Sequence, residues 1–154
     1  MCRPPGASYN NGMHTAERPI TEAMPSGPRW AVGGRFVDAL GQRDFDGMAR
    51  CLDRSVQFRG LLPSGPFDVV GPEAAMVRFR QWFGGPDLCE MIDATVGEVG
   101  SKLYLRWRVA MTPASSGAPV RVAEQHLFAT IDQRIVGLDL LCSGFSVRSA
   151  DRAC

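Results

Sequence analysis

The sequence predicts an α+β domain in which helices come first and antiparallel strands come last. Two observations lead to this prediction. Apolar residues recur at helical spacing near the start of the chain, and residues 101–145 contain three runs rich in Val, Leu, Ile and aromatics, separated by turn-forming segments. The first two of these runs are long for strands, and strands of that length usually curl. We therefore expect a curved sheet whose concave face carries any function.

Composition and net charge indicate which kinds of partner the protein is expected to have. The chain has 154 residues, 45% of them apolar and 21% charged, which suits one globular domain with a substantial core. The formal net charge of +1 predicts neither a nucleic-acid partner nor a membrane surface. There is no apolar run of about 18 residues and no signal-peptide pattern, so we expect a cytoplasmic protein.

The cysteines do not predict a metal site. Five are present, with no CxxC pair and no spacing that matches a metal template: Cys2, Cys51, Cys89, Cys142 and Cys154. Reduced thiols are the expected state. We expect no metal and no cofactor.

The folded domain is expected over residues 29–146. Residues 1–28 are rich in Pro, Gly, Ser, Asn and Thr and contain few large apolar side chains, which predicts a disordered arm. Residues 147–154 are expected to form a flexible tail.

Three helices are predicted. Val32, Phe36 and Leu40 have helical spacing, although two glycines weaken this helix. Asp44 is a suitable N-cap for a second, short helix. A third helix is expected to begin at Pro72, which suits the first helical position, and to end at the glycines 84–85.

Strands are predicted from alternation and from turn residues. Residues 55–61 alternate as a strand, and residues 62–70, with two prolines and a glycine, are expected to form a loop. Further strands are expected over 88–99, 101–112, 120–131 and 135–145.

The order of these segments resembles the SnoaL-like branch of the nuclear transport factor 2-like superfamily. The resemblance covers about residues 29–145 and rests on RFVDAL, DFDGMARCLDRSVQF, VVGPEAAMVRFRQWF, EQHLF and DQRIVGLDL. It implies a cone: a strongly curved sheet wrapped against three helices, with a pocket inside. The fold carries many activities as well as pure binding, so the resemblance alone implies no particular reaction.

The residues that carry chemistry in this superfamily match only in part. SnoaL-like cyclases place a histidine in a motif like EQHLF and a catalytic aspartate in the last strand, and the matching positions here are His126 and Leu140. Limonene-epoxide-hydrolase-like members have Arg-x-Asp in the long strand, where this chain has Arg106 and Arg108. Ketosteroid isomerases use a carboxylate in the first strand, where VQFRG offers none. Each of these three reactions thus lacks its key carboxylate in this chain.

Alternation divides each long strand into two faces. One set comprises Tyr104, Arg106, Arg108, Ala110, Val122, Glu124, His126 and Phe128. The other comprises Leu103, Leu105, Trp107, Val109, Met111, Arg121, Ala123, Gln125, Leu127 and Ala129. Alternation does not decide which set faces inward. The second set is the more apolar, but the resemblance implies that the first set lines the pocket.

The resemblance therefore implies a catalytic group of His126, Arg106 and Tyr104. His126 would move a proton, and the arginine would stabilise an oxyanion with help from the tyrosine. The ligand-binding residues would be Arg108, Glu124, Phe128, Leu138, Leu140 and Phe79. Glu124 would neutralise one arginine and leave the other charge available for an anionic oxygen.

Structural interpretations of the same residues stay open. His126 could be a structural histidine bonded to Glu124 or Tyr104, and the two arginines could form a surface ion-pair ladder with Glu124. Asp139 is expected on the face opposite Leu140 unless a bulge intervenes. Phe79 suits the core as well as a ligand platform.

Two functions remain. One is a cofactor-independent isomerase, cyclase or hydratase acting on a small hydrophobic carbonyl compound, and the other is a non-catalytic binder of a small apolar acid. The expected partners are a small hydrophobic molecule, anionic in the second case, and a second copy of the chain. The homodimer would pair through the outer face of the sheet, where Leu105, Trp107 and Val109 would supply an apolar patch.

Overall fold

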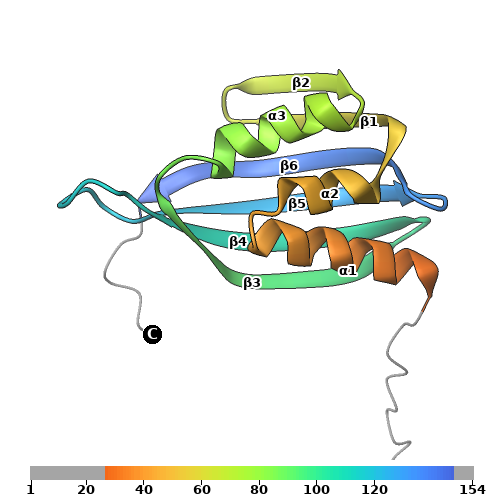
Figure 1. Ribbon diagram of the computed structural model, residues 1–154, viewed down its shortest axis with the longest axis horizontal. Helices are drawn as coiled ribbons and strands as arrows, with labels where there is room; N and C mark the ends of the chain where they lie inside the picture. Colours follow the sequence, from red (N-terminus) through yellow and green to blue (C-terminus); the bar gives the residue numbers. More distant parts are fainter. Residues whose placement is uncertain (1–26, 148–154) are drawn as a thin grey trace, which may run out of the picture.

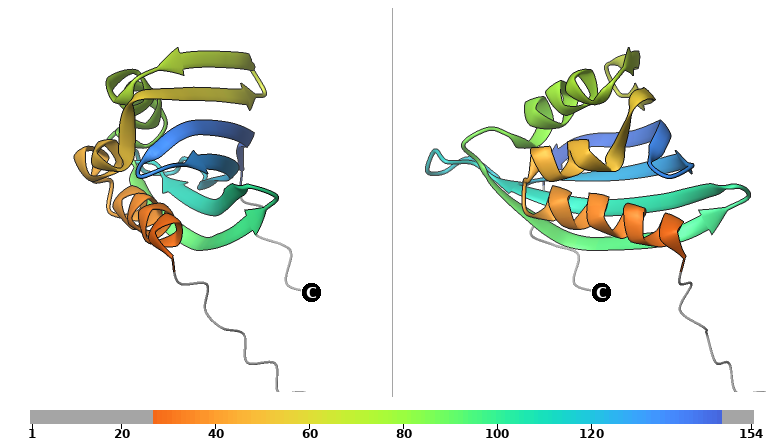
Figure 2. Two further views of the ribbon diagram at one scale, coloured as in Figure 1. Left: turned by 90° about the vertical axis from the view of Figure 1, so that its right-hand side faces the viewer. Right: turned by 45° about the vertical axis from the view of Figure 1, so that its right-hand side comes forward.

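Three helices cover one face of a curved six-stranded sheet, and no helix within residues 27–147 covers the other face (Figures 1 and 2). The computed structural model describes residues 27–147. The expectations for an N-terminal arm and a C-terminal tail fall mainly on residues 1–26 and 148–154, which lie outside the described part. We call the face that contacts the helices the inner face and the opposite one the outer face. The predicted α+β class is confirmed.

All three predicted helices are present. They are α1 (Pro28–Gly41), α2 (Phe45–Cys51) and α3 (Pro72–Phe83). The Asp44 carboxylate caps α2, because its Oδ1 accepts a hydrogen bond from the Gly47 N–H at 2.8 Å. None of the helices within residues 27–147 is long and apolar enough to cross a bilayer.

The strands form one sheet in the order β2-β1-β6-β5-β4-β3. Their bounds are Leu52–Leu62 (β1), Gly65–Val70 (β2), Leu88–Val99 (β3), Lys102–Thr112 (β4), Arg121–Ile131 (β5) and Ile135–Val147 (β6). Neighbouring strands are antiparallel except for β1 and β6, which are parallel. The five predicted strands are confirmed, with small changes at their ends.

One prediction is wrong: residues 62–70 are not a loop throughout. Gly65–Val70 forms β2, which pairs with β1 as a hairpin. Pro66 suggested a loop because proline cannot donate a ladder hydrogen bond. An edge strand tolerates proline, and β2 is the edge of the sheet.

Aromatic and aliphatic side chains fill the space between the helices and the inner face. Phe36 of α1, Phe58 of β1, Phe79 of α3 and Trp107 of β4 all have 0% exposure. The Phe58 and Phe79 rings stack with centroids 5.3 Å apart. Helix α1 lies close to the sheet at Gly33, where a Cβ atom would come within 2.3 Å of the Leu103 side chain. A larger residue at position 33 would therefore force the buried Leu103 side chain to move.

A β-bulge interrupts the pairing of β5 with β6. Ala123 lies opposite Phe145, whereas Gln125 lies opposite Cys142, so β6 contains one additional residue there. Gly144 has φ 75°, a conformation that favours glycine. The bulge follows the Leu138–Cys142 segment and therefore leaves the facing of that segment unchanged.

Candidate functional site

The predicted catalytic residues lie on the outer face of the sheet, away from the helices. The side chains of Arg106, His126 and Arg108 are 26%, 36% and 42% exposed. Their chain neighbours Leu105 and Trp107 have 0% exposure on the inner face. The prediction that the even-numbered residues of β4 and β5 line an internal pocket is therefore wrong.

The physical reason is the cost of burying charge. Placing the two arginines of β4 inside the core would remove their guanidinium groups from water, and only well-placed partners could offset that loss. The odd-numbered set of β4 has no charged group and fills the core with aliphatic and aromatic surface. The prediction that Leu105, Trp107 and Val109 form an apolar dimer patch is also wrong. These side chains belong to the core and are 0%, 0% and 1% exposed.

The outer face nevertheless brings the predicted polar residues together. The Tyr104 hydroxyl lies 2.7 Å from His126 Nδ1, and His126 Nε2 lies 3.3 Å from Glu124 Oε1. The same Glu124 oxygen accepts a hydrogen bond from Arg106 Nε at 2.5 Å. We call this chain of contacts, together with Arg108 and its partner on β3, the outer-face network. The imidazole is thus held between a carboxylate and a phenol.

Asp93 of β3 completes the outer-face network, and sequence reasoning missed it. Its Oδ1 accepts a hydrogen bond from Arg106 NH1 at 3.0 Å, and its Oδ2 accepts one from Arg108 Nε at 2.7 Å. The expectation that one arginine charge stays available is therefore wrong. Two guanidinium groups face two carboxylates, and the network is neutral when His126 is neutral. The signal that was missed is the register of β3 against β4, which a bulge before Asp93 shifts.

The network holds its carboxyl groups in the charged form. Hydrogen bonds from Arg108 keep the pKa of Asp93 below its ordinary value, and a hydrogen bond from Arg106 does the same for the pKa of Glu124. A lowered folded-state pKa means that the unfolded chain binds protons first as the pH falls. This contribution to stability is present at neutral pH and is lost as the pH drops through the ordinary carboxyl range of about 4 and below.

We expect the Asp93→Asn variant to show this loss. Its urea unfolding midpoint should lie below that of the wild type at pH 7, and the gap should close as the pH falls toward 3. The control is Glu90→Gln, an exposed carboxylate on the same strand with no ion pair among residues 27–147. It should follow the wild-type profile. A gap between wild type and Asp93→Asn that stays constant with pH would contradict the assignment.

The predicted ligand-binding residues are divided between the two faces. Phe128 lies on the outer face, where its ring is 5.3 Å from that of Tyr104. Phe79, Leu138 and Leu140 lie in the core at 0%, 0% and 2% exposure. The alternative interpretation of Phe79 as a core residue is therefore confirmed, and these residues do not form one pocket with the outer-face network.

Asp139 lies on the outer face, opposite in facing to Leu140, as predicted. Its carboxylate accepts hydrogen bonds from Arg59 Nε at 3.0 Å and from Lys102 Nζ. Burial raises the pKa of Asp139, but the bonds from Lys102 and Arg59 outweigh it and lower the value overall. No bulge brings this carboxylate to the inner face, so the aspartate of the cyclases has no counterpart there.

The inner face carries a polar contact that the sequence did not predict. Gln125 is 1% exposed, its Oε1 accepts a hydrogen bond from Trp107 Nε1 at 2.9 Å, and its Nε2 lies 3.4 Å from Cys142 Sγ. The buried amide is thereby satisfied by side chains of neighbouring strands. Among residues 27–147, no three His, Cys, Asp or Glu side chains converge to hold a metal ion.

This architecture defines an α+β protein of the nuclear transport factor 2-like fold. The chain belongs to the SnoaL-like domain family, whose model matches residues 34–138. No curated protein sequence matches the chain significantly.

Solved structures share the fold at low sequence identity. A provisionally assigned polyketide cyclase from Xanthomonas campestris pv. campestris is 20% identical, with a TM-score of 0.56 over 75% of this chain and 92% of that one. An LEH-like epoxide hydrolase from M. tuberculosis is 15% identical, with a TM-score of 0.55 over 75% of this chain and 83% of that one. A provisionally assigned isomerase from Bacillus subtilis is 11% identical, with a TM-score of 0.61 over 75% and 86%. The different activities in these names show that the fold does not identify the reaction.

Proposed function

We propose that this SnoaL-like protein is a non-catalytic binding protein that works as a homodimer paired through the outer face of its sheet. One observation carries the proposal: the titratable groups suited to proton transfer lie on that face and are paired with one another. The inner side, where the resemblance implies a pocket, is filled by side chains such as Phe58, Phe79 and Trp107. Neither the outer face nor the inner side therefore offers an enclosed site in which a charged group lacks an oppositely charged partner.

The outer face carries exposed apolar side chains beside its polar network. Leu61 of β1 and Leu141 of β6 are paired neighbours that are 54% and 49% exposed. Both border a shallow depression of about 430 Å³ beside His126. Exposed apolar residues next to satisfied polar groups are typical of the centre and rim of protein interfaces.

Charge balance supports a second copy as the occupant. A two-fold axis places the same patch of each subunit against the other. The outer-face network is neutral when His126 is uncharged, because Arg106 and Arg108 are matched by Asp93 and Glu124. Two such faces can therefore meet without net repulsion.

Sedimentation velocity tests this pairing. The wild type should sediment as a dimer with twice the 16.7 kDa mass of the chain. Leu141→Glu should give monomers, because it places a charge within the apolar part of the proposed interface. The matched control is Val77→Glu, since Val77 is 51% exposed on α3 and lies on the opposite side of the molecule. A monomeric wild type, or a dimer that survives Leu141→Glu, contradicts the proposal.

A second candidate is a cofactor-independent proton-transfer enzyme acting on a small hydrophobic carbonyl compound. The Tyr104–His126–Glu124 chain favours it, because the carboxylate orients an imidazole that can exchange a proton with the phenol. Arg106 is already paired with Glu124 and Asp93 through Nε and NH1, so it would donate from its NH2 group to the developing oxyanion. The test is α-proton exchange of a cyclic ketone in D2O, followed by NMR. If His126→Ala exchanges the ketone as fast as the wild type does, this candidate is excluded.

A further inference from the structure

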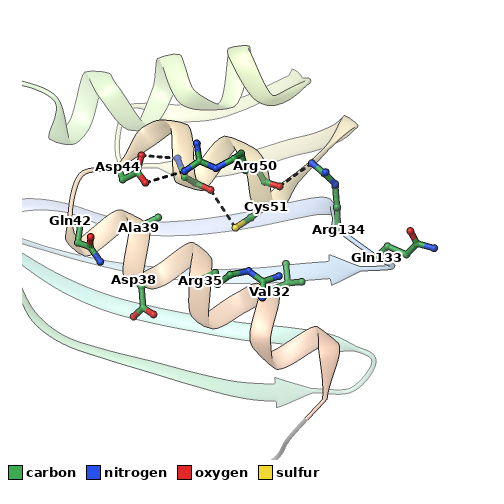
Figure 3. A pocket seen from close by; sticks show the side chains of 11 residues that line it. Val32, Arg35, Asp38, Ala39, Gln42, Asp44, Arg50, Cys51, Gln133 and Arg134 are labelled. Carbon is green, nitrogen blue, oxygen red and sulfur yellow. Dashed lines mark hydrogen bonds and ion pairs between the residues drawn. The ribbon is translucent and has the colours of Figure 1, made fainter.

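A groove between α1 and α2 gathers arginines from three parts of the fold. Its volume is about 430 Å³, and the turn between β5 and β6 borders one end (Figure 3). Arg35 comes from α1, Arg50 from α2 and Arg134 from the turn. The groove lies on the helical side of the molecule, apart from the outer-face network.

Two of the three guanidinium groups have no carboxylate partner in the described part of the chain. Arg50 pairs with Asp44 at 3.4 Å, and that carboxylate also caps α2. Arg134 donates a hydrogen bond to the Arg50 carbonyl oxygen at 3.0 Å. Neither Arg134 nor Arg35 has an ion pair among the residues from 27 to 147. The Asp38 carboxylate, which also lines the groove, points away from α2 in Figure 3.

All three arginines line the groove whose floor holds Cys51. Cys51 lies there at 7% exposure, with its thiol 3.5 Å from the Gly47 carbonyl oxygen. Burial raises the pKa of the Cys51 thiol, and the charges of Arg35, Arg50 and Arg134 all act against that rise. The positive charges of three separate segments therefore act on the same place.

The floor itself is apolar. Val32 and Ala39 of α1 line it and are 6% and 9% exposed. An apolar floor stabilises the carbon part of a ligand, whereas a bare inorganic ion gains nothing from it. Guanidinium groups hold the two oxygens of a carboxylate in paired hydrogen bonds.

We propose that the groove between α1 and α2 binds a small organic carboxylate. Arg35 and Arg134 hold the carboxylate, and the carbon part of the ligand lies against Val32 and Ala39. This inference rests on the proposed non-catalytic binding function and places its ligand. A volume near 430 Å³ lies within the range of ligand sites and suits a molecule of a few rings or fewer.

The test is an NMR titration of the full-length, ¹⁵N-labelled protein with benzoate. Saturable shifts are expected for amides of α1, α2 and the β5–β6 turn, with a Kd of about 1 mM or tighter. Benzyl alcohol, which keeps the ring and lacks the charge, should give no saturable shift. The double variant Arg35→Gln, Arg134→Gln should bind benzoate at least about tenfold more weakly, a loss of about 1.4 kcal/mol. Arg54→Gln, an exposed arginine of β1 outside the groove, is the matched control and should bind normally.

Each contrary result has a definite meaning. Shifts that map elsewhere, equal binding of benzyl alcohol, or equal competition by inorganic phosphate would overturn the carboxylate site. Both substituted arginines are exposed, and far-UV circular dichroism checks that the double variant is folded. Loss of the site with an intact dimer would leave the proposed function standing. Turnover of a carboxylate bound in the groove would instead overturn the non-catalytic function and leave the site.

Discussion

Trp107→Ala is expected to destabilise the protein by about 3–5 kcal/mol, which is the usual cost of truncating a buried aromatic side chain. The Trp107 ring is 0% exposed on the inner face of β4. Its removal also takes away the indole N–H that donates to Gln125 Oε1 at 2.9 Å, and the buried amide is left with an unsatisfied oxygen. Urea unfolding followed by far-UV circular dichroism measures the loss without depending on tryptophan fluorescence.

The control for this experiment is the next residue of the same strand. Arg108 lies on the outer face at 42% side-chain exposure, so Arg108→Ala should cost much less than Trp107→Ala, because exposed ion pairs contribute little to stability. If Trp107→Ala does not fold at all, Trp107→Phe keeps most of the ring volume and should give a measurable, smaller loss. Equal costs at the two positions would mean that the inner and outer faces of β4 are assigned incorrectly.

Phe79→Ala is expected to cost a similar amount, about 3–5 kcal/mol, because it removes the centre of the aromatic cluster. The Phe79 ring stacks on Phe58 at 5.3 Å and contacts Phe36 and Trp82 edge to face at 5.7 Å and 5.4 Å. The side chain has 0% exposure and joins α3 to both α1 and β1. Denaturant unfolding at pH 7 measures the effect.

Val77→Ala on the same helix is the matched control. Val77 is 51% exposed, so its truncation should change stability by no more than about 0.5 kcal/mol. A cost below about 1 kcal/mol for Phe79→Ala would show that the space under α3 is loosely filled and open to a ligand. That result would also weaken the proposal that the protein does no chemistry on its inner side.

Local sequence signals predicted most of the fold because most helices and strands begin and end at residues that favour those positions. Asp44 predicted a cap and forms one, and Pro72 predicted the first turn of α3. Strand β2 was missed because Pro66 normally argues against a strand. Whether a proline lies at an edge depends on the order of strands in the sheet, and that order is not a local property.

The candidate site was harder to predict because alternation identifies two faces without naming the inner one. The apolar set containing Trp107 indicated the core correctly, and the resemblance of His126 to a catalytic histidine pointed the other way. Asp93 was missed because its meeting with Arg106 and Arg108 depends on the register of two strands. The arginines of the groove between α1 and α2 are separated in sequence. Only the packing of α1 against α2 places Arg35 and Arg50 along the same groove.

The bulge in β6 has a consequence for how this chain can vary in length. The bulge places two residues of β6 opposite one residue of β5, so β6 gains a residue without changing the face that Phe145 occupies. Phe145 lies opposite Ala123, with its ring 6.4 Å from that of Phe83. Deleting Ser143 or Gly144 would therefore restore regular pairing and still leave Phe145 on the inner face. Homologues that are one residue shorter at this point should consequently keep an apolar side chain against Phe83.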